Sequence, residues 1–355
     1  MVTSSRSWTW LALLCLAPSW SIALRAADPV KASLATAAKV EKSVELAIGY
    51  LKTESESWLK TRKCASCHHA PMALWALGEV ARQGYTIDKK YTADLLETMI
   101  GSNEKMIAAK MINGPGDTPD PRPSGQGLNM GLPFMAVGAR SAGIVSTGQK
   151  QSLKLIADEI VKKQKPDGSW DFFANLRRPP INEFQTTDAV WILLALQDAP
   201  ADELTDAHRA ALKKGLAWLE KAKLSDSLQD QVFHLLMELR AGKPRKDLEP
   251  LVVNLFARQH PNGGWGQLPG HPADAFATGQ ALYVLSYAGF TAKRPELKPA
   301  IDFLVASQKP DGSWPMTSRS TPNGEPGGSK LLTPITCAAS AWATLGLSRL
   351  FPKGS

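Results

Sequence analysis

The sequence lacks any apolar run long enough to cross a membrane. The best candidate extends from Trp8 to Ala17 and is followed at once by Pro18 and Ser19. A membrane-spanning helix needs roughly 20 predominantly apolar residues, and no later segment comes closer to that length. We therefore expect no stable insertion into a membrane.

The chain also lacks long low-complexity segments and any concentrated run of one charge. Hydrophobic residues make up 44% of its 355 residues, and the formal net charge of +8 comes from basic residues scattered along the sequence. Scattered basic residues are typical of solvated helix faces rather than of a nucleic-acid-binding surface. We expect a globular protein that binds no nucleic acid.

The first 26 residues show the pattern of a secretory signal. Arg6 precedes the short apolar stretch, which is followed by the small residues Ala26 and Ala27, and this order is typical of a cleaved leader. We predict that residues 1–26 are removed and that residues 27–355 form one domain in the periplasm or another exported location.

A turn motif recurs three times. The segments KKQKPDGSW, ARQHPNGGW and ASQKPDGSW end at Trp170, Trp265 and Trp314, and in each a Gln stands six residues before the Trp. Pro followed by Asp or Asn and then Gly favours a turn, because Pro fixes φ and Gly adopts conformations that other residues resist. Each copy therefore predicts the end of one helix and the start of a turn.

The spacing of these motifs predicts six units of two helices. Gln259 and Gln308 are 49 residues apart, whereas Gln164 and Gln259 are 95 apart, so the longer gap holds one degenerate unit. In the first unit, Trp58 stands at the position of the motif Trp. A charged amphipathic helix precedes a more apolar one in each unit, and a helix that is apolar nearly all round is buried. We predict an all-α toroid of six parallel inner helices, with their N-termini on one rim, inside six outer helices.

These units resemble the QW motifs of the squalene-hopene cyclase and prenyltransferase superfamily over nearly the whole mature chain. The resemblance implies an α/α toroid. Squalene-type cyclases start their reaction with an acid in a DxDD motif, and this sequence has no such string; the nearest, Asp117 to Asp120 in GDTPDPRP, lacks the pattern. No convincing match to the prenyltransferase zinc ligands occurs either. The resemblance therefore implies the fold more firmly than the chemistry.

A CxxCH motif occupies residues 64–68 and predicts a covalently attached haem c. One helical turn presents the thiols of Cys64 and Cys67 to the two vinyl groups, and the next residue, His68, supplies an imidazole to the iron. We predict His68 as the proximal iron ligand. His69 lies next to it on the same helix and is predicted to lie beside the haem without binding the iron.

Met130 is the predicted distal iron ligand, because it begins the second inner helix just after a long Gly/Pro-rich loop. An ordinary core methionine is the alternative, and a vacant iron position would favour ligand binding or peroxide chemistry over electron transfer. Two other interpretations of the cysteines stay open. In one, Cys64 and Cys67 form a disulfide. In the other, they bind zinc together with a His and Cys337, which is expected to begin the sixth inner helix beside the first.

Acidic and aromatic residues gather at the predicted inner helices. Asp188, Asp230 and Asp274 stand near helix starts, with Thr186 and Thr187 beside the first, where they either cap the helices or form a ring of carboxylates around a cavity. Aromatic side chains of the same helices are either core or the wall of a pocket for an apolar ligand such as a terpenoid or quinone. They are Trp75, Phe134, Trp191, Phe276, Tyr283 and Trp342.

The sequence thus favours an exported c-type haem protein that serves electron transfer or a haem-dependent redox step. Its expected partner is a redox protein or a small molecule in the toroid cavity. The alternative is a squalene cyclase-like or prenyltransferase-like enzyme, or a binding module for a terpenoid, lipid or glycan, with CxxCHH as a zinc or structural site. A non-catalytic scaffold is the third possibility.

Overall fold

The computed structural model describes residues 29–62, 69–101, 127–143, 146–171, 179–319 and 334–353. Within these ranges the chain forms helices, turns and isolated bridges. The signal predicted at residues 1–26 and the haem motif at residues 64–68 lie outside the described residues, so both stay predictions. In the described ranges, no helix combines the length and the apolar character that a membrane crossing requires.

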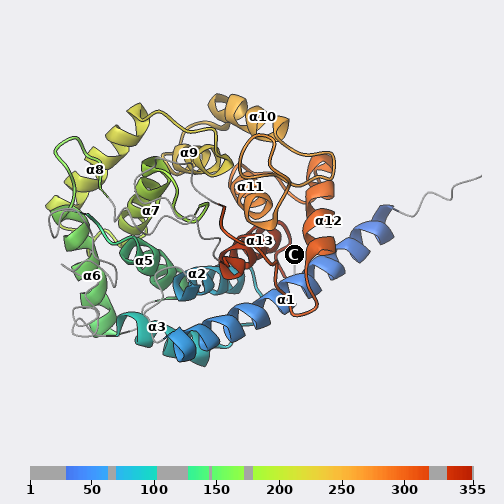
Figure 1. Ribbon diagram of the computed structural model, residues 1–355, viewed down its shortest axis with the longest axis horizontal. Coiled ribbons are helices and arrows are strands. Elements are labelled where there is room, and N and C mark those ends of the chain that lie inside the picture. The colour runs from blue at the N-terminus through green and yellow to red at the C-terminus, as the bar shows by residue number, and fades with distance from the viewer. Residues whose placement is uncertain are drawn as a thin grey trace, which may run out of the picture.

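An inner ring of helices surrounds a central axis, and each helix packs on the next until the last closes on the first (Figure 1). The predicted parallel orientation is confirmed where helix starts meet. Thr186 donates a hydrogen bond to Asp230 over 2.5 Å, and Cys337 Sγ lies 3.6 Å from the carbonyl oxygen of His69. The ring consists of α2 (His69–Arg82), α5 (Gly131–Ala142), α7 (Gln185–Gln197), α9 (Leu228–Arg240), α11 (Ala275–Tyr287) and α13 (Thr336–Leu350).

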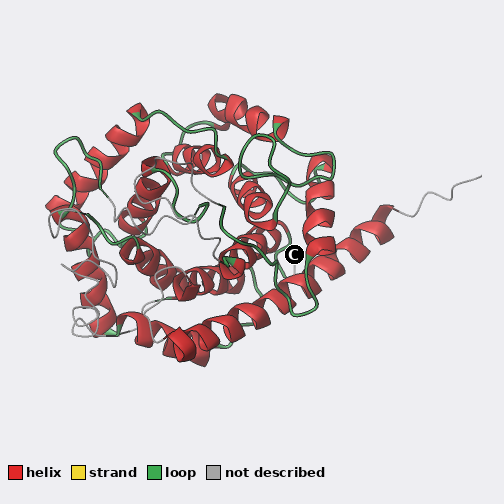
Figure 2. Ribbon diagram, viewed as in Figure 1, coloured by secondary structure: helices red, strands yellow, loops and turns green. Residues whose placement is uncertain are grey.

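A second ring of helices encircles the first, and Figure 2 shows the two concentric layers. The inner helix α13 is buried along nearly its whole length, whereas an outer helix buries one face and leaves charged side chains in water. The predicted all-α toroid is therefore confirmed. The outer ring consists of α1 (Pro29–Arg62), α3 (Lys89–Ile100), α6 (Thr147–Lys162), α8 (Asp206–Lys221), α10 (Glu249–Ala257) and α12 (Lys298–Ser307).

The turn after α12 shows how the repeated motif joins the units. Gln308 donates its side-chain N–H to the carbonyl oxygens of Gly312 and Ser43, over 3.0 and 2.9 Å. Gly312 has φ of +89°, and a Cβ atom there would lie 2.2 Å from the carbonyl oxygen of Leu46. Only glycine fits this position. Because Ser43 and Leu46 belong to α1, the turn closes the outer ring.

The other two copies of the motif make equivalent contacts. Gln164 donates to the carbonyl oxygen of Ala211 on α8 over 2.9 Å, and Gln259 donates to that of Glu296, just before α12, over 3.1 Å. Each motif therefore holds its own turn and the next outer helix together. The prediction that the motif ends a helix and begins a turn is confirmed at these three places.

The first unit differs from that prediction. Trp58 lies inside α1, which continues to Arg62, and its ring stacks on His69 with the ring centroids 3.5 Å apart. A turn at Trp58 was expected from its spacing alone and is wrong. The segment ESESWLKTR contains neither Pro nor Gly, so nothing in it stops the helix.

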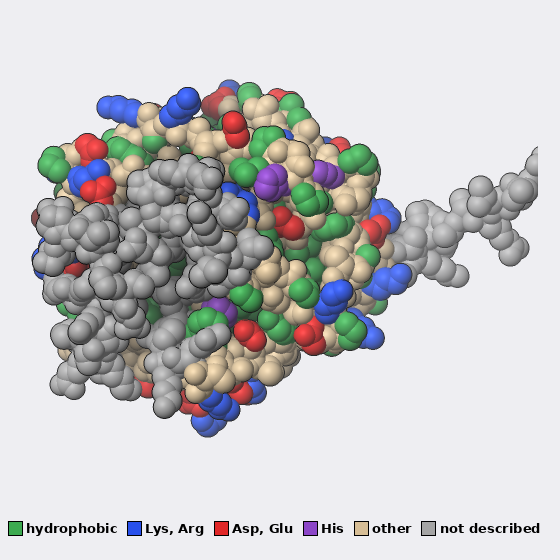
Figure 3. Space-filling model, viewed as in Figure 1, with side chains coloured by type: hydrophobic (Ala, Val, Ile, Leu, Met, Phe, Trp, Pro, Cys, Tyr) green, Lys and Arg blue, Asp and Glu red, His purple; other side chains and the backbone are tan. Residues whose placement is uncertain are grey.

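Charged side chains are mixed on the surface. Figure 3 shows Lys and Arg side chains interspersed with Asp and Glu on the described part of the face in view. Several of these form pairs along one outer helix, such as Lys90 with Asp94 over 2.5 Å and Lys154 with Asp158 over 2.7 Å. Such exposed pairs contribute little to stability and keep the outer faces hydrated.

Candidate functional site

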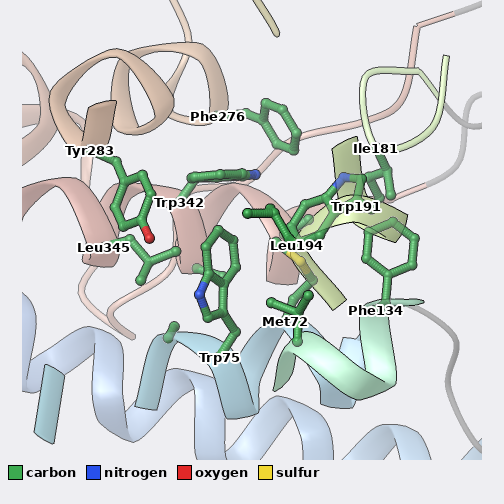
Figure 4. Close-up of a cluster of buried hydrophobic side chains, with 14 of the residues drawn as sticks. Met72, Trp75, Phe134, Ile181, Trp191, Leu194, Phe276, Tyr283, Trp342 and Leu345 are labelled. Carbon is green, nitrogen blue, oxygen red and sulfur yellow. The ribbon is translucent and has the colours of Figure 1, made fainter. Parts of the chain in front are cut away.

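Aromatic side chains meet at the axis of the inner ring, as Figure 4 shows. The ring centroid of Trp75 lies 4.7 Å from that of Trp342 and 5.2 Å from that of Trp191, and both pairs are nearly perpendicular. Edge-to-face contacts of this kind are favourable. All six inner helices contribute one or more buried rings to this aromatic layer, which consists of Trp75, Phe134, Trp191, Phe233, Phe276, Tyr283 and Trp342.

Two indole groups of the aromatic layer keep unused hydrogen-bond donors. The Nε1–H groups of Trp191 and Trp342 are buried and have no acceptor within the part of the chain that the structure describes. A buried donor without an acceptor is unfavourable by roughly 1–3 kcal/mol. An oxygen atom of a bound molecule would relieve that penalty, so these donors mark the axis as a place for a ligand.

Asp188 is one of the buried carboxyl groups near this layer. It lies in the first turn of α7 and is 1% exposed. Trp191 follows it by three residues, and residues at this spacing are neighbours on a helix surface. Asp188 does not cap α7, because the residue before this helix is Phe184. The predicted capping role of Asp188 is therefore wrong.

Asp230 and Asp274 have structural partners. Asp230 lies in the first turn of α9, which Ser227 caps, and it accepts hydrogen bonds from Thr186 and from both the N–H and the hydroxyl of Ser225, over 2.5, 2.7 and 2.6 Å. Asp274 caps α11, as predicted, by accepting from the N–H of Ala277 over 2.8 Å. Burial raises the pKa of Asp274 above its ordinary value.

A buried segment before α7 lies next to the aromatic layer. Its residues Ile181 and Glu183 are 5% and 3% exposed, and Ile181 lies beside Trp191 in Figure 4. The carbonyl oxygen of Pro180 accepts a hydrogen bond from Gln229 over 2.7 Å. Glu183 forms an ion pair with Arg319. The structure thus places polar groups from several segments along one side of the aromatic layer.

A relay of amides continues this polar arrangement. Gln229 accepts a hydrogen bond from Gln280 of α11 over 2.7 Å. Gln267 accepts from Arg319 over 3.2 Å and donates to Asp274 over 2.9 Å. Sequence reasoning missed these glutamines and Arg319, since an isolated Gln or Arg carries no local signal and only the fold brings these residues together.

Three residues that the sequence analysis linked to the cysteine motif, His69, Cys337 and Met130, lie among the described residues and are buried. His69 begins α2, is 4% exposed, and places Nε2 3.8 Å from Glu54 Oε1. Cys337 is buried against the His69 carbonyl, as its predicted position beside the first inner helix requires, and burial raises the pKa of its thiol. Met130 lies in the hydrophobic core just before α5. The iron-related roles predicted for His69 and Met130 stay predictions.

Comparison with known proteins gives two curated relatives. No family model matches the chain. A drimenyl diphosphate synthase from Streptantibioticus cattleyicolor is 28% identical over 208 residues, and one from Streptomyces showdoensis is 26% identical over 199 residues. Each match covers 53% of this chain and 36% of the relative. The chain therefore spans little more than a third of the length of these relatives.

Solved structures share the fold over almost the whole chain. The type II terpene cyclase MstE from Scytonema, in complex with its substrate geranylgeranyl dihydroxybenzoate or its product merosterolic acid A, has a TM-score of 0.54 at 15% identity. The alignment covers 90% of this chain and 99% of MstE. UGL in complex with dGlcA-Glc-Rha-Glc also has a TM-score of 0.54, at 12% identity, over 88% of this chain and 99% of UGL. These likenesses confirm the α/α toroid.

The haem-dependent electron-transfer function expected from CxxCH is wrong. The two curated relatives are drimenyl diphosphate synthases, which supports the terpenoid alternative better than electron transfer. The haem prediction rests on five residues, whereas the match to each relative extends over 53% of the chain. Attachment of haem at Cys64 and Cys67, with His68 on the iron, lies outside the described residues and is untested.

Proposed function

We propose that this protein cyclises an acyclic terpenoid at the axis of its inner ring. The observation that carries the proposal is a buried carboxyl, Asp188, one helical turn from a layer of buried aromatic rings. The names of the relatives and the ligand of MstE support the same class of substrate. The activity of the longer relatives enters here only as support for this proposal.

The aromatic layer provides what a carbocation needs. A cation over the face of an indole or phenyl ring is attracted by the ring quadrupole, most strongly by Trp. Trp75, Trp191 and Trp342 are 0–5% exposed, so water that would capture the cation is excluded. The layer therefore stabilises positive charge and protects it at the same place.

Asp188 is the proposed proton donor. The proton passes from its carboxyl group to a terminal alkene carbon, the remaining double bonds close into rings, and loss of a proton from the last cation completes the reaction. The oxygens of Asp230 and Asp274 are occupied by hydrogen bonds that hold the loop and helix starts. In this protein a single Asp in QTTDAVW takes the place of the missing DxDD acid.

Product analysis tests this function. Purified protein is incubated with farnesyl diphosphate, geranylgeranyl diphosphate and squalene. The two diphosphate reactions are then treated with phosphatase, and all organic extracts are separated by gas chromatography with mass spectrometry. We expect one of the three substrates to yield a cyclic product that is an isomer of that substrate. Recovery of all three unchanged from folded, helical protein would reject cyclisation of these substrate lengths.

A further inference from the structure

A cavity of about 350 Å³ lies between the two rings, away from the axis. Its walls come from the inner helices α5 and α7, the outer helix α6, and the loop that leads into α8. No step of the proposed cyclisation uses it. Ligand pockets in proteins commonly have volumes of about 300–1,000 Å³, so the cavity is large enough to hold a small molecule.

Small aliphatic side chains form most of the cavity wall. Ala136 of α5 and Ala195 of α7 are 4% and 6% exposed, and together with Ala157 of α6 they line the cavity. Leucine and isoleucine side chains from the same helices complete an apolar surface. The aliphatic lining residues are Ala136, Leu153, Ile156, Ala157, Ile160, Ala195, Leu196, Ala199 and Leu204.

In the first unit, the residue three positions after the inner helix carries a buried ring. Tyr85, three residues after α2 ends, is 4% exposed and donates its hydroxyl to the carbonyl oxygen of Phe351 over 2.8 Å. The equivalent residue after α7 is Pro200, which is exposed and does not line the cavity. After α11 it is Phe290, whose ring forms a wall of a smaller space of about 300 Å³. The third unit thus lacks the buried ring that the first carries.

Most charged side chains around the cavity are paired within the protein. Arg140 forms an ion pair with Glu203, Lys150 lies 4.0 Å from the same carboxylate, and Lys154 pairs with Asp158 over 2.7 Å. A charged ligand would have to compete with these pairs. Uncharged polar groups at the opening, from Thr147, Gln151 and Thr205, suit a hydroxyl group instead.

We propose that this cavity is a second binding site, which takes a neutral aliphatic or isoprenoid alcohol of about a dozen carbon atoms. An apolar cavity of about 150 Å³ holds one benzene molecule, and the present space is more than twice as large. The chain of the alcohol contacts the alanine, leucine and isoleucine wall, and its hydroxyl lies at the threonine-lined opening. The site is independent of the proposed cyclisation.

Calorimetric titration with 1-dodecanol tests the site. This alcohol has no double bond and is not a cyclase substrate. We expect saturable binding at one site per chain in the wild type and at least tenfold weaker binding in Ala157→Phe, whose ring fills the space. Ala217→Phe places the same ring on the exposed face of α8, outside the cavity, and should bind as the wild type does.

A second filling variant keeps the test decisive if Ala157→Phe does not fold. Ala199→Leu adds less volume at another wall of the same cavity and should also weaken dodecanol binding. Unchanged affinity in a folded filling variant, or no saturable binding by the wild type, overturns the proposal. Asp188→Asn should bind dodecanol normally, so failure of the cyclase proposal and failure of this site give different results.

Discussion

Tryptophans occupy two regions of this toroid and behave differently in each. In the turns, Trp170, Trp265 and Trp314 each donate Nε1–H to the carbonyl oxygen ten residues earlier, over 2.7–2.9 Å. At the axis, Trp191 and Trp342 are equally buried but donate to nothing in the described part of the chain. The turn tryptophans complete the fold, whereas the axial ones keep a donor available.

Burial alone therefore does not separate structural from functional tryptophans. A core position normally satisfies every polar atom, and the turn tryptophans follow that rule in all three motifs. The axial pair departs from that rule. Trp191 lies one helical turn after Asp188 on α7, and its ring is 6.2 Å from that of Trp342. Such a departure is expected at a binding site rather than in a supporting turn.

The largest expected effect comes from changing one carboxyl in each region. Asp188→Asn should lower the cyclisation rate by about 10²–10⁴-fold, because general acid catalysis contributes that much, while the circular dichroism melt stays close to the wild type. Asp311→Asn is the control in a turn. Its Oδ1 accepts from the N–H and hydroxyl of Ser313. In another motif the Oδ1 of Asn262 accepts from the N–H of Gly264, so an Asn suits this position and the change should leave the rate intact. Equal rates for both variants would remove Asp188 from the reaction.

The next-largest effect concerns the buried ion pairs of Glu79, whose partner Arg349 contacts the aromatic layer. Glu79 is 2% exposed and pairs with Arg349 and Arg82, and Arg349 lies over the rings of Tyr283 and Tyr287. Glu79→Gln should lower the free energy of unfolding by about 3–5 kcal/mol at pH 7, the usual result of breaking a buried pair. Urea denaturation of both proteins measures the difference.

The pH dependence of this difference has a definite sign. Burial by itself raises the pKa of Glu79, but hydrogen bonds from Arg82 and the charge of Arg349 outweigh it and hold the pKa below 4.5. A lowered pKa in the folded state adds stability above the ordinary value, and that stability is lost as the pH falls through the folded-state pKa. Wild type and Glu79→Gln should therefore converge in acid. A gap that persists undiminished at pH 3 contradicts this account.

The smallest effect compares the two kinds of tryptophan directly. Trp314→Phe removes one of the hydrogen bonds that the Leu304 carbonyl accepts, the others coming from Ser307 and Gln308. It should cost about 0.5–1.5 kcal/mol beyond the loss of ring volume. Trp342→Phe removes an N–H that has no acceptor in the described residues and should cost less. Thermal unfolding of the two variants gives the difference, and equal losses would show that the unused donor has no significance.

The repeat made most of the fold predictable. The turn motif depends on residues next to one another in sequence, so KPDGSW and its relatives identified three turns, and their spacing gave the rest of the ring. The prediction was wrong at Trp58, where no Pro or Gly interrupts α1. His208 stands on the charged helix α8, yet it is 1% exposed and lies 2.9 Å from Asp158 of α6, because burial depends on the neighbouring helix.

The candidate site was predictable only in part. Asp188 and the aromatic residues other than Phe233 were found because they lie on apolar helices; Phe233 was missed. Their mutual contacts, the missing acceptors and the relay through Gln229 and Gln280 depend on residues far apart in sequence, which no local pattern contains. The CxxCH prediction failed for another reason, because a motif of five neighbouring residues was used to infer the function of the whole chain.

Deuterium incorporation tests the central claim most directly. A substrate that is turned over is incubated with the wild-type protein in heavy water, and the product is analysed by mass spectrometry. Protonation by a carboxyl that exchanges with solvent predicts one deuterium, carbon-bound at the end of the chain where cyclisation starts. A cyclic product that carries no deuterium would show that the reaction does not begin with an acid.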